Sequence, residues 1–178
     1  RTYSLKKEPI TRRKIHKNWD EPSLCGPDDD GNWTRDFHCG DLKGISDTIK
    51  YLKELGVEII YLSPIVESQS THRYDAADYK KVDSYAGTNQ MLKELCQKAH
   101  QNGIRIVLDA VFNHTGNDSV YFNQFGTYDS IGAYQVEKDE KYKGLKSPYS
   151  EYYKKYCHYG IHDFEYWWGM GNLPVCDG

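Results

Sequence analysis

An aliphatic run that leads directly into polar side chains is the feature that most constrains the fold of this chain. Residues 104–111 are mostly Ile, Val, Leu and Ala, with Asp109 near the end, and Asn113 and His114 follow at once. A short β-branched run of this kind predicts a strand buried on both faces, as in a parallel sheet. Polar side chains gathered where such a strand ends are typical of the active-site edge of an α/β barrel. The run therefore predicts a parallel α/β fold with a functional site at this edge.

The preceding residues predict two helices and another strand. Apolar residues recur at helical spacing over residues 45–55, and Gly56 suits the position just after that helix. Residues 57–62 are mostly β-branched or aromatic and predict a strand. Thr88 is a suitable N-cap for a second helix, which Gly103 ends. The resulting order is helix, strand, helix, strand, which is typical of parallel βα units.

This pattern divides the chain into three predicted segments. Residues 1–40 show no sustained periodicity and are predicted to be mostly loop. Residues 41–114 carry the βα units, and residues 115–178, rich in Tyr, Gly, Asn and Ser, predict a long excursion with short elements. The two long loops, 63–87 and 112–178, leave the carboxyl ends of the strands. Sites in parallel α/β folds lie at that edge.

The composition indicates which classes of binding partner and which cellular compartment to expect. The chain has 178 residues and a net charge of −3, which gives no reason to expect a nucleic acid or an anionic membrane as partner. No apolar run approaches the roughly 18 residues of a membrane span. The five cysteines contain no CxxC pair, which argues against a structural zinc site and favours a reducing cytoplasm. Because the chain begins at Arg1 rather than Met, secretion stays open.

Two readings of the polar loop residues are open from their types alone. Tyr74 followed by Asp75 offers a sugar ring a stacking face and an acceptor for its hydroxyl groups. The alternative is a loop that folds on itself through Asx turns and tyrosine packing. In the same way, Asp109 is either a functional carboxylate or a cap for backbone donors, and His114 is either a ligand-binding or a structural residue.

In their order along the chain, these segments resemble the α-amylase family of glycoside hydrolases. Residues 109–114 are similar to the first conserved region of that family. Further similar segments are residues 40–45 at the first barrel helix, 51–65 through the second barrel strand, and 74–79, 82–83 and 87–88 in the substrate loop. The neopullulanase and cyclomaltodextrinase branch is indicated by residues 114–116, 167–169 and 173–174. The resemblance covers about residues 37–178.

The resemblance implies a fold and a set of substrate-binding residues. The expected fold is part of a TIM (β/α)8 barrel with a long irregular excursion after its third strand. Tyr74 is expected to stack under the sugar at the cleavage subsite, and Asp75 to support that subsite. His114 is expected to hydrogen-bond hydroxyl groups of the same ring, while Asn113 and Asp109 organise the strand end.

The same resemblance implies a calcium site. Asp41 matches an acidic position that joins an N-terminal calcium site in this branch, and Asn113 matches a calcium ligand of many amylases. Oxygen ligands of this kind suit calcium. Upstream oxygens are offered by Asn18, Asp20 and residues 28–30, although their spacing matches neither the branch nor an EF-hand. His38 and Cys39 stand where the branch usually has an aromatic residue and a glycine.

The implied function is retaining hydrolysis of α-1,4 or α-1,6 bonds in α-glucan oligosaccharides. That chemistry needs two carboxyl groups about 5 Å apart, and in this family both come from later barrel strands. The chain is therefore expected to need the rest of its barrel and to be inactive alone. Two alternatives stay open, a non-catalytic carbohydrate-binding relative and a transglycosidase or isomerase of the same family.

Overall fold

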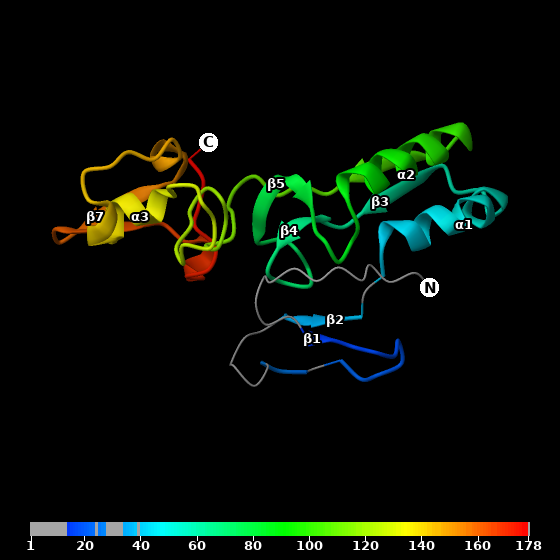
Figure 1. Cartoon of the computed structure of the whole chain (residues 1–178), viewed down its shortest axis with the longest axis horizontal. Coiled ribbons are helices and arrows are strands. Elements are labelled where there is room, and N and C mark those ends of the chain that lie inside the picture. The colour runs from blue at the N-terminus through cyan, green and yellow to red at the C-terminus, as the bar shows by residue number, and fades with distance from the viewer. Residues whose placement is uncertain (1–13, 24, 28–33, 39, 178) are drawn as a thin grey trace. The chain divides into compact units, whose positions relative to one another are not determined.

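The computed structural model describes residues 14–23, 25–27, 34–38 and 40–177. The chain forms two compact units, one of residues 1–73 and 80–109 and the other of residues 74–79 and 110–178. Figure 1 traces the elements of both. No helix in the described part of the chain has the length and apolar character to cross a membrane. The three segments drawn from the sequence remain a prediction.

The first unit contains the expected βα units. Helix α1 (Leu42–Glu54) precedes strand β3 (Ile59–Leu62), and helix α2 (Asn89–Gln101) precedes strand β6 (Arg105–Leu108). Strands β3 and β6 pair in parallel, with Ile60 opposite Ile106. The two helices pack against each other beside these strands (Figure 1). The helix–strand order is the predicted one, and the described residues form no closed barrel.

Both helices end at the predicted glycines, and α2 begins at the predicted cap Thr88, whereas the cap of α1, Asp41, was not predicted. The Asp41 carboxylate accepts a hydrogen bond from the backbone N–H of Gly44 at 2.8 Å and caps α1. The Thr88 hydroxyl accepts one from the N–H of Met91 at 3.1 Å and caps α2. After the helices, Gly56 and Gly103 take left-handed φ values of 84° and 76°. A side chain would be strained there, so these glycines terminate the helices.

The core of the first unit lies where the helices meet one face of the sheet. Leu95 and Ile104 are fully buried there, together with Leu42, Ile49, Leu62, Val82, Ala86 and Ala99. The prediction that residues 104–111 are buried on both faces is wrong for this structure, because Val107 is 41% exposed and Leu108 45%. On the neighbouring strand Tyr61 is 63% exposed. Among the described residues this sheet has two strands, and the core cluster covers a single face.

Two short strand pairs lie in segments that the sequence predicted to be loop. Strand β1 (Lys14–Ile15) pairs in parallel with β2 (Asp36–Phe37), within the predicted N-terminal loop. Strand β4 (Val66–Ser68) pairs with β5 (Ala76–Val82), within the predicted loop after β3. Strands β1, β2 and β4 have two or three residues and carry no readable periodicity. The seven residues of β5 do not alternate between apolar and polar side chains, so they gave no strand signal either.

The second unit is an aromatic cluster surrounded by short elements, as predicted for the long excursion. In chain order these are α3 (Ala133–Lys138), the 3-10 turns η1 (Glu140–Tyr142) and η2 (Ser150–Tyr152), the hairpin strands β7 (Lys155–His158) and β8 (Ile161–Phe164), and η3 (Trp167–Gly169). Phe122 is fully buried, and its ring lies 4.7 Å from that of Phe164 and 5.0 Å from that of Tyr153. Edge-on ring packing of this kind holds together a unit that has little regular secondary structure.

Candidate functional site

The His114 ring contacts two other predicted site residues, Tyr74 and Asn113, within the second unit. His114 is only 3% exposed. Nε2 lies 3.1 Å from the carbonyl oxygen of Tyr74, and Nδ1 lies 3.0 Å from the side-chain nitrogen of Asn113. A carbonyl oxygen only accepts and an amide nitrogen only donates, so Nε2 carries the proton and Nδ1 accepts. The neutral imidazole therefore ties the backbone at Tyr74 to the segment that follows β6.

The backbone around His114 is held by the end of the chain and by a tyrosine. His114 forms an antiparallel bridge with Val175, and Asn113 accepts a backbone hydrogen bond from Cys176 at 2.9 Å. The Tyr79 hydroxyl lies 3.0 Å from the His114 carbonyl oxygen, to which it donates. Burial raises the pKa of the Tyr79 hydroxyl, which keeps it protonated as a donor. Since both ring nitrogens of His114 have partners, a sugar hydroxyl that binds this ring must replace one of them.

The Tyr74–Asp75 pair presents one exposed and one buried side chain. Tyr74 is 39% exposed, whereas Asp75 is 8% exposed. Gly116 approaches the backbone of this pair closely, because a Cβ atom at Gly116 would lie 2.7 Å from the Asp75 carbonyl oxygen. The N–H of Gly116 also donates to the Ala76 carbonyl oxygen at 2.9 Å. The absence of a side chain at Gly116 therefore allows the two segments of the site to meet.

A stack of aromatic rings leads from His114 to the solvent. The His114 ring stacks on Trp167 with centroids 5.0 Å apart, and Trp167 stacks on Trp168 at 4.2 Å. Trp168 is 79% exposed and has a φ of 52°, which is rare for a residue with a side chain. These tryptophans contribute to the family resemblance, but they were not predicted as candidate site residues. The signal was present as two adjacent tryptophans before a glycine in a polar segment.

The remaining predicted residues lie in the first unit. Asp109 follows β6, is half-buried, and its backbone N–H donates to the Leu62 carbonyl oxygen at 2.9 Å. Asp41 is 7% exposed; Oδ1 caps α1, and Oδ2 is buried without a hydrogen-bond partner among the described residues. A buried carboxylate oxygen of this kind suits a bound cation.

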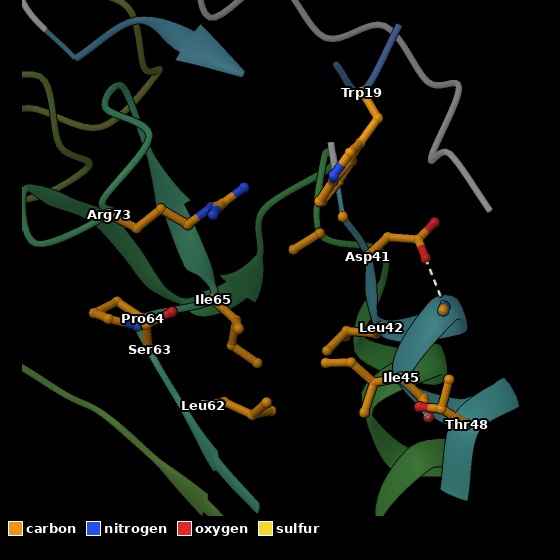
Figure 2. A pocket seen from close by; sticks show the side chains of 13 residues that line it. Trp19, Asp41, Leu42, Ile45, Thr48, Leu62, Ser63, Pro64, Ile65 and Arg73 are labelled. Atoms are coloured by element: carbon orange, nitrogen blue, oxygen red, sulfur yellow. Dashed lines mark hydrogen bonds between the residues drawn. The ribbon is translucent and has the colours of Figure 1, made fainter. Parts of the chain in front are cut away.

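Asp41 also borders a cavity of about 490 Å³ (Figure 2). Leu42 and Ile45 face Leu62 and Ile65 across it, and Trp19, Arg73, Pro64 and Ala86 complete much of its wall. A sugar ring needs several hydrogen-bond partners for its hydroxyl groups, whereas this lining is mainly apolar. We therefore place the candidate sugar contacts in the second unit, around Tyr74 and His114.

Known proteins resemble this chain over most of its length. Residues 17–166 match the family described as alpha amylase, catalytic domain. An amylopullulanase of Thermoanaerobacterium saccharolyticum is 46% identical over 185 residues, which cover 98% of this chain and 14% of that protein. A cyclomaltodextrinase of Thermoanaerobacter pseudethanolicus is 54% identical over 86 residues, 48% of this chain and 15% of that protein.

A solved structure agrees with these relatives. The type III pullulan hydrolase from Thermococcus kodakarensis superposes with a TM-score of 0.68 at 29% identity, covering 93% of this chain and 26% of that chain. The present chain thus spans 14% and 15% of the two curated relatives. The match extends across both compact units.

Proposed function

The chain belongs to the α-amylase family, and we propose that the protein carrying it is a retaining hydrolase of α-glucan oligosaccharides. The observation that carries the proposal is the buried His114, which joins the Tyr74 backbone, Asn113 and the Trp167 ring in one arrangement. Relatives named amylopullulanase and cyclomaltodextrinase support the same substrate class. The bonds attacked would be α-1,4 or α-1,6 glucosidic bonds.

In this proposal the residues described above bind and orient the sugar. The exposed Tyr74 ring provides an apolar face for a glucose unit, and Asp75 supports the backbone beneath it. His114 offers an N–H and an acceptor nitrogen that exchange their present partners for sugar hydroxyl groups. Hydrogen bonds that strengthen as the ring distorts contribute to glycoside hydrolysis. We propose that the nucleophile and the general acid/base come from other parts of the whole protein.

Product analysis tests the proposal against its alternatives. The whole protein is incubated with maltooligosaccharides, pullulan and a cyclomaltodextrin, and products are separated by chromatography. Shorter sugars formed with water as acceptor are the expected result. Longer or rearranged sugars would instead indicate a transglycosidase or isomerase. Binding measured by calorimetry without any product would indicate a non-catalytic carbohydrate-binding protein.

Tyr74→Ala is expected to weaken maltooligosaccharide binding by about 2- to 12-fold, because loss of an aromatic stacking face costs about 0.5–1.5 kcal/mol. Tyr74→Phe keeps the ring and is expected to bind nearly as well as the native protein. Tyr159→Ala serves as the control, since Tyr159 is 94% exposed at the β7–β8 turn. The Kd is measured by calorimetry, and an unchanged Kd in Tyr74→Ala would refute the stacking role.

We also propose that Ca²⁺ binds at Asp41. The buried Oδ2 of Asp41 supports this, because calcium prefers oxygen ligands. The upstream residues 28–30 lie outside the described residues. Asn113 is a separate candidate in the second unit; its side-chain nitrogen is engaged with His114, which leaves the amide oxygen as its ligand atom.

Calcium is expected to raise the thermal stability of the native protein and to lose that effect in Asp41→Asn. Saturation at 100 times the Kd would stabilise by about 2.7 kcal/mol. Asparagine is a good N-cap, so the calcium-free variant should unfold at nearly the native temperature. Asp47→Asn, on the exposed part of α1, is the matched control. The measurement is the Tm with calcium and with a chelator, and an equal calcium shift in Asp41→Asn would contradict this site.

A further inference from the structure

Two histidines and an aspartate of the first unit lie together near the β1–β2 pair. Potential metal-ligating atoms of His16, Asp36 and His38 all lie within 4.8 Å of one another. The parallel pairing brings them together, because the backbone N–H of His16 donates to the Phe37 carbonyl oxygen at 2.9 Å. The two imidazole rings lie face to face with centroids 4.1 Å apart. His16 is 4% exposed, and the other two are half-buried.

Glu21 is hydrogen-bonded to one nitrogen of each histidine ring. Nδ1 of His16 lies 2.8 Å from a Glu21 carboxylate oxygen, and Nε2 of His38 donates to the Glu21 carbonyl oxygen at 2.9 Å. Asn18 in turn donates to the Glu21 carboxylate from both its backbone and its side chain. Nε2 of His16 faces Asp36, to which it is hydrogen-bonded. Each ring therefore has one nitrogen bound to Glu21, and the other nitrogen of His16 is bound to Asp36.

This arrangement matches the surroundings of metal-binding histidines in proteins. Such a histidine uses one nitrogen for the metal and donates the other N–H to a carboxylate or a backbone carbonyl. Glu21 supplies both kinds of partner. The Trp19 ring also contacts His38 edge-on at 6.4 Å, which helps to fix its orientation.

We propose that His16, Asp36 and His38 bind a transition-metal ion, with Zn²⁺ as the best fit. Imidazole and carboxylate ligands suit zinc, whereas calcium prefers oxygen ligands alone. The ion takes the place of the proton that His16 now shares with Asp36. Zinc bonds of about 2.0–2.2 Å place ligand atoms about 3.4 Å from one another. Nε2 of His16 and the Asp36 oxygen, which are now hydrogen-bonded, therefore move apart on binding, and the stacked His38 ring rotates to direct its nitrogen at the ion. A water molecule completes the fourth position.

None of the proposed zinc ligands is among the residues proposed to bind the sugar, so this proposal does not rest on the hydrolase function. It is also distinct from the calcium proposal at Asp41, which rests on oxygen atoms. Binding would cross-link residues 16 and 38, which a two-residue strand pair otherwise joins.

Calorimetric titration of the whole metal-free protein with Zn²⁺ tests the site. His38→Phe keeps an aromatic ring between His16 and Trp19 but removes the nitrogen, and should lose one bound zinc per chain. Asp36→Asn should weaken zinc binding by at least about tenfold. Glu21→Gln should weaken it by about 10-fold, because the carboxylate that holds His16 Nδ1 is lost. His100→Phe, on the exposed face of α2, is the matched control and should bind as the native protein does.

Co²⁺ provides a spectroscopic check on the ligands. Bound cobalt should give visible absorption bands in the native protein and in His100→Phe, and these bands should be absent in His38→Phe. Thermal unfolding without metal verifies that the variants are folded. If His38→Phe does not fold, Asp36→Asn takes its place in the comparison. Two results would contradict the proposal: native-like zinc stoichiometry and affinity in both His38→Phe and Asp36→Asn, or no zinc binding by the native protein. Either would show that the two histidines are only stacked and hydrogen-bonded to Asp36 and Glu21.

Discussion

His114→Ala is expected to lower the turnover of α-glucans by about 100-fold, with a smaller loss in substrate affinity. The ring occupies a buried position, and its removal takes a donor from the Tyr74 carbonyl oxygen and a stacking partner from Trp167. Removing one hydrogen-bond donor that acts on the transition state typically costs about 10²–10³ in kcat. Under the proposed function, contacts that strengthen as the sugar distorts disappear, so kcat falls more than binding weakens.

Steady-state kinetics and calorimetric binding on the whole protein measure these two losses separately. His114→Gln retains an N–H group and an oxygen in place of the ring nitrogens, and is expected to recover part of the turnover. His158→Ala removes an exposed histidine of the same unit and should leave both quantities unchanged. Equal losses in turnover and in affinity for His114→Ala would show that His114 only positions the substrate.

The helices and the parallel strands were predictable because their signals are local. Thr88, Gly56 and Gly103 act on backbone groups within a few residues, so their effect can be read from the neighbouring sequence. The β1–β2 pair was not predictable in this way. Its two-residue strands have no period, and they pair only because distant segments are brought together.

The candidate site was only partly predictable for the same reason. Residue types and the family resemblance placed Tyr74 and His114 in one subsite, but not the hydrogen bond between the histidine ring and the Tyr74 backbone. The contact forms between residues 40 positions apart in the sequence, so no local pattern predicts it. The His16–His38 pair was not predicted, because neither cysteine spacing nor the oxygen ligands of a calcium site carry information about histidines that meet through a strand pair.

The close approach of Gly116 to Asp75 connects the packing of the second unit to the candidate site. A Cβ atom at Gly116 would meet backbone atoms, the Asp75 oxygen at 2.7 Å and carbon at 3.2 Å, which cannot rotate away as a side chain would. The same peptide segment carries the Tyr74 carbonyl that His114 holds. A small increase in side-chain volume at Gly116 must therefore displace either the Tyr74–Asp75 backbone or the segment that carries Gly116.

Gly116→Ala is accordingly expected to destabilise the protein by about 1–3 kcal/mol, the usual cost of overpacking. It should also lower kcat/KM by about 100-fold, because a displacement of about 1 Å in a positioning segment has that effect. Gly171→Ala is the matched control, since a Cβ atom there meets nothing within 4 Å. Both substitutions restrict the unfolded chain equally, so the difference between their unfolding free energies isolates the clash. Chemical denaturation and steady-state kinetics measure the two effects. Native stability and activity in Gly116→Ala would mean that the two segments are not held at this distance.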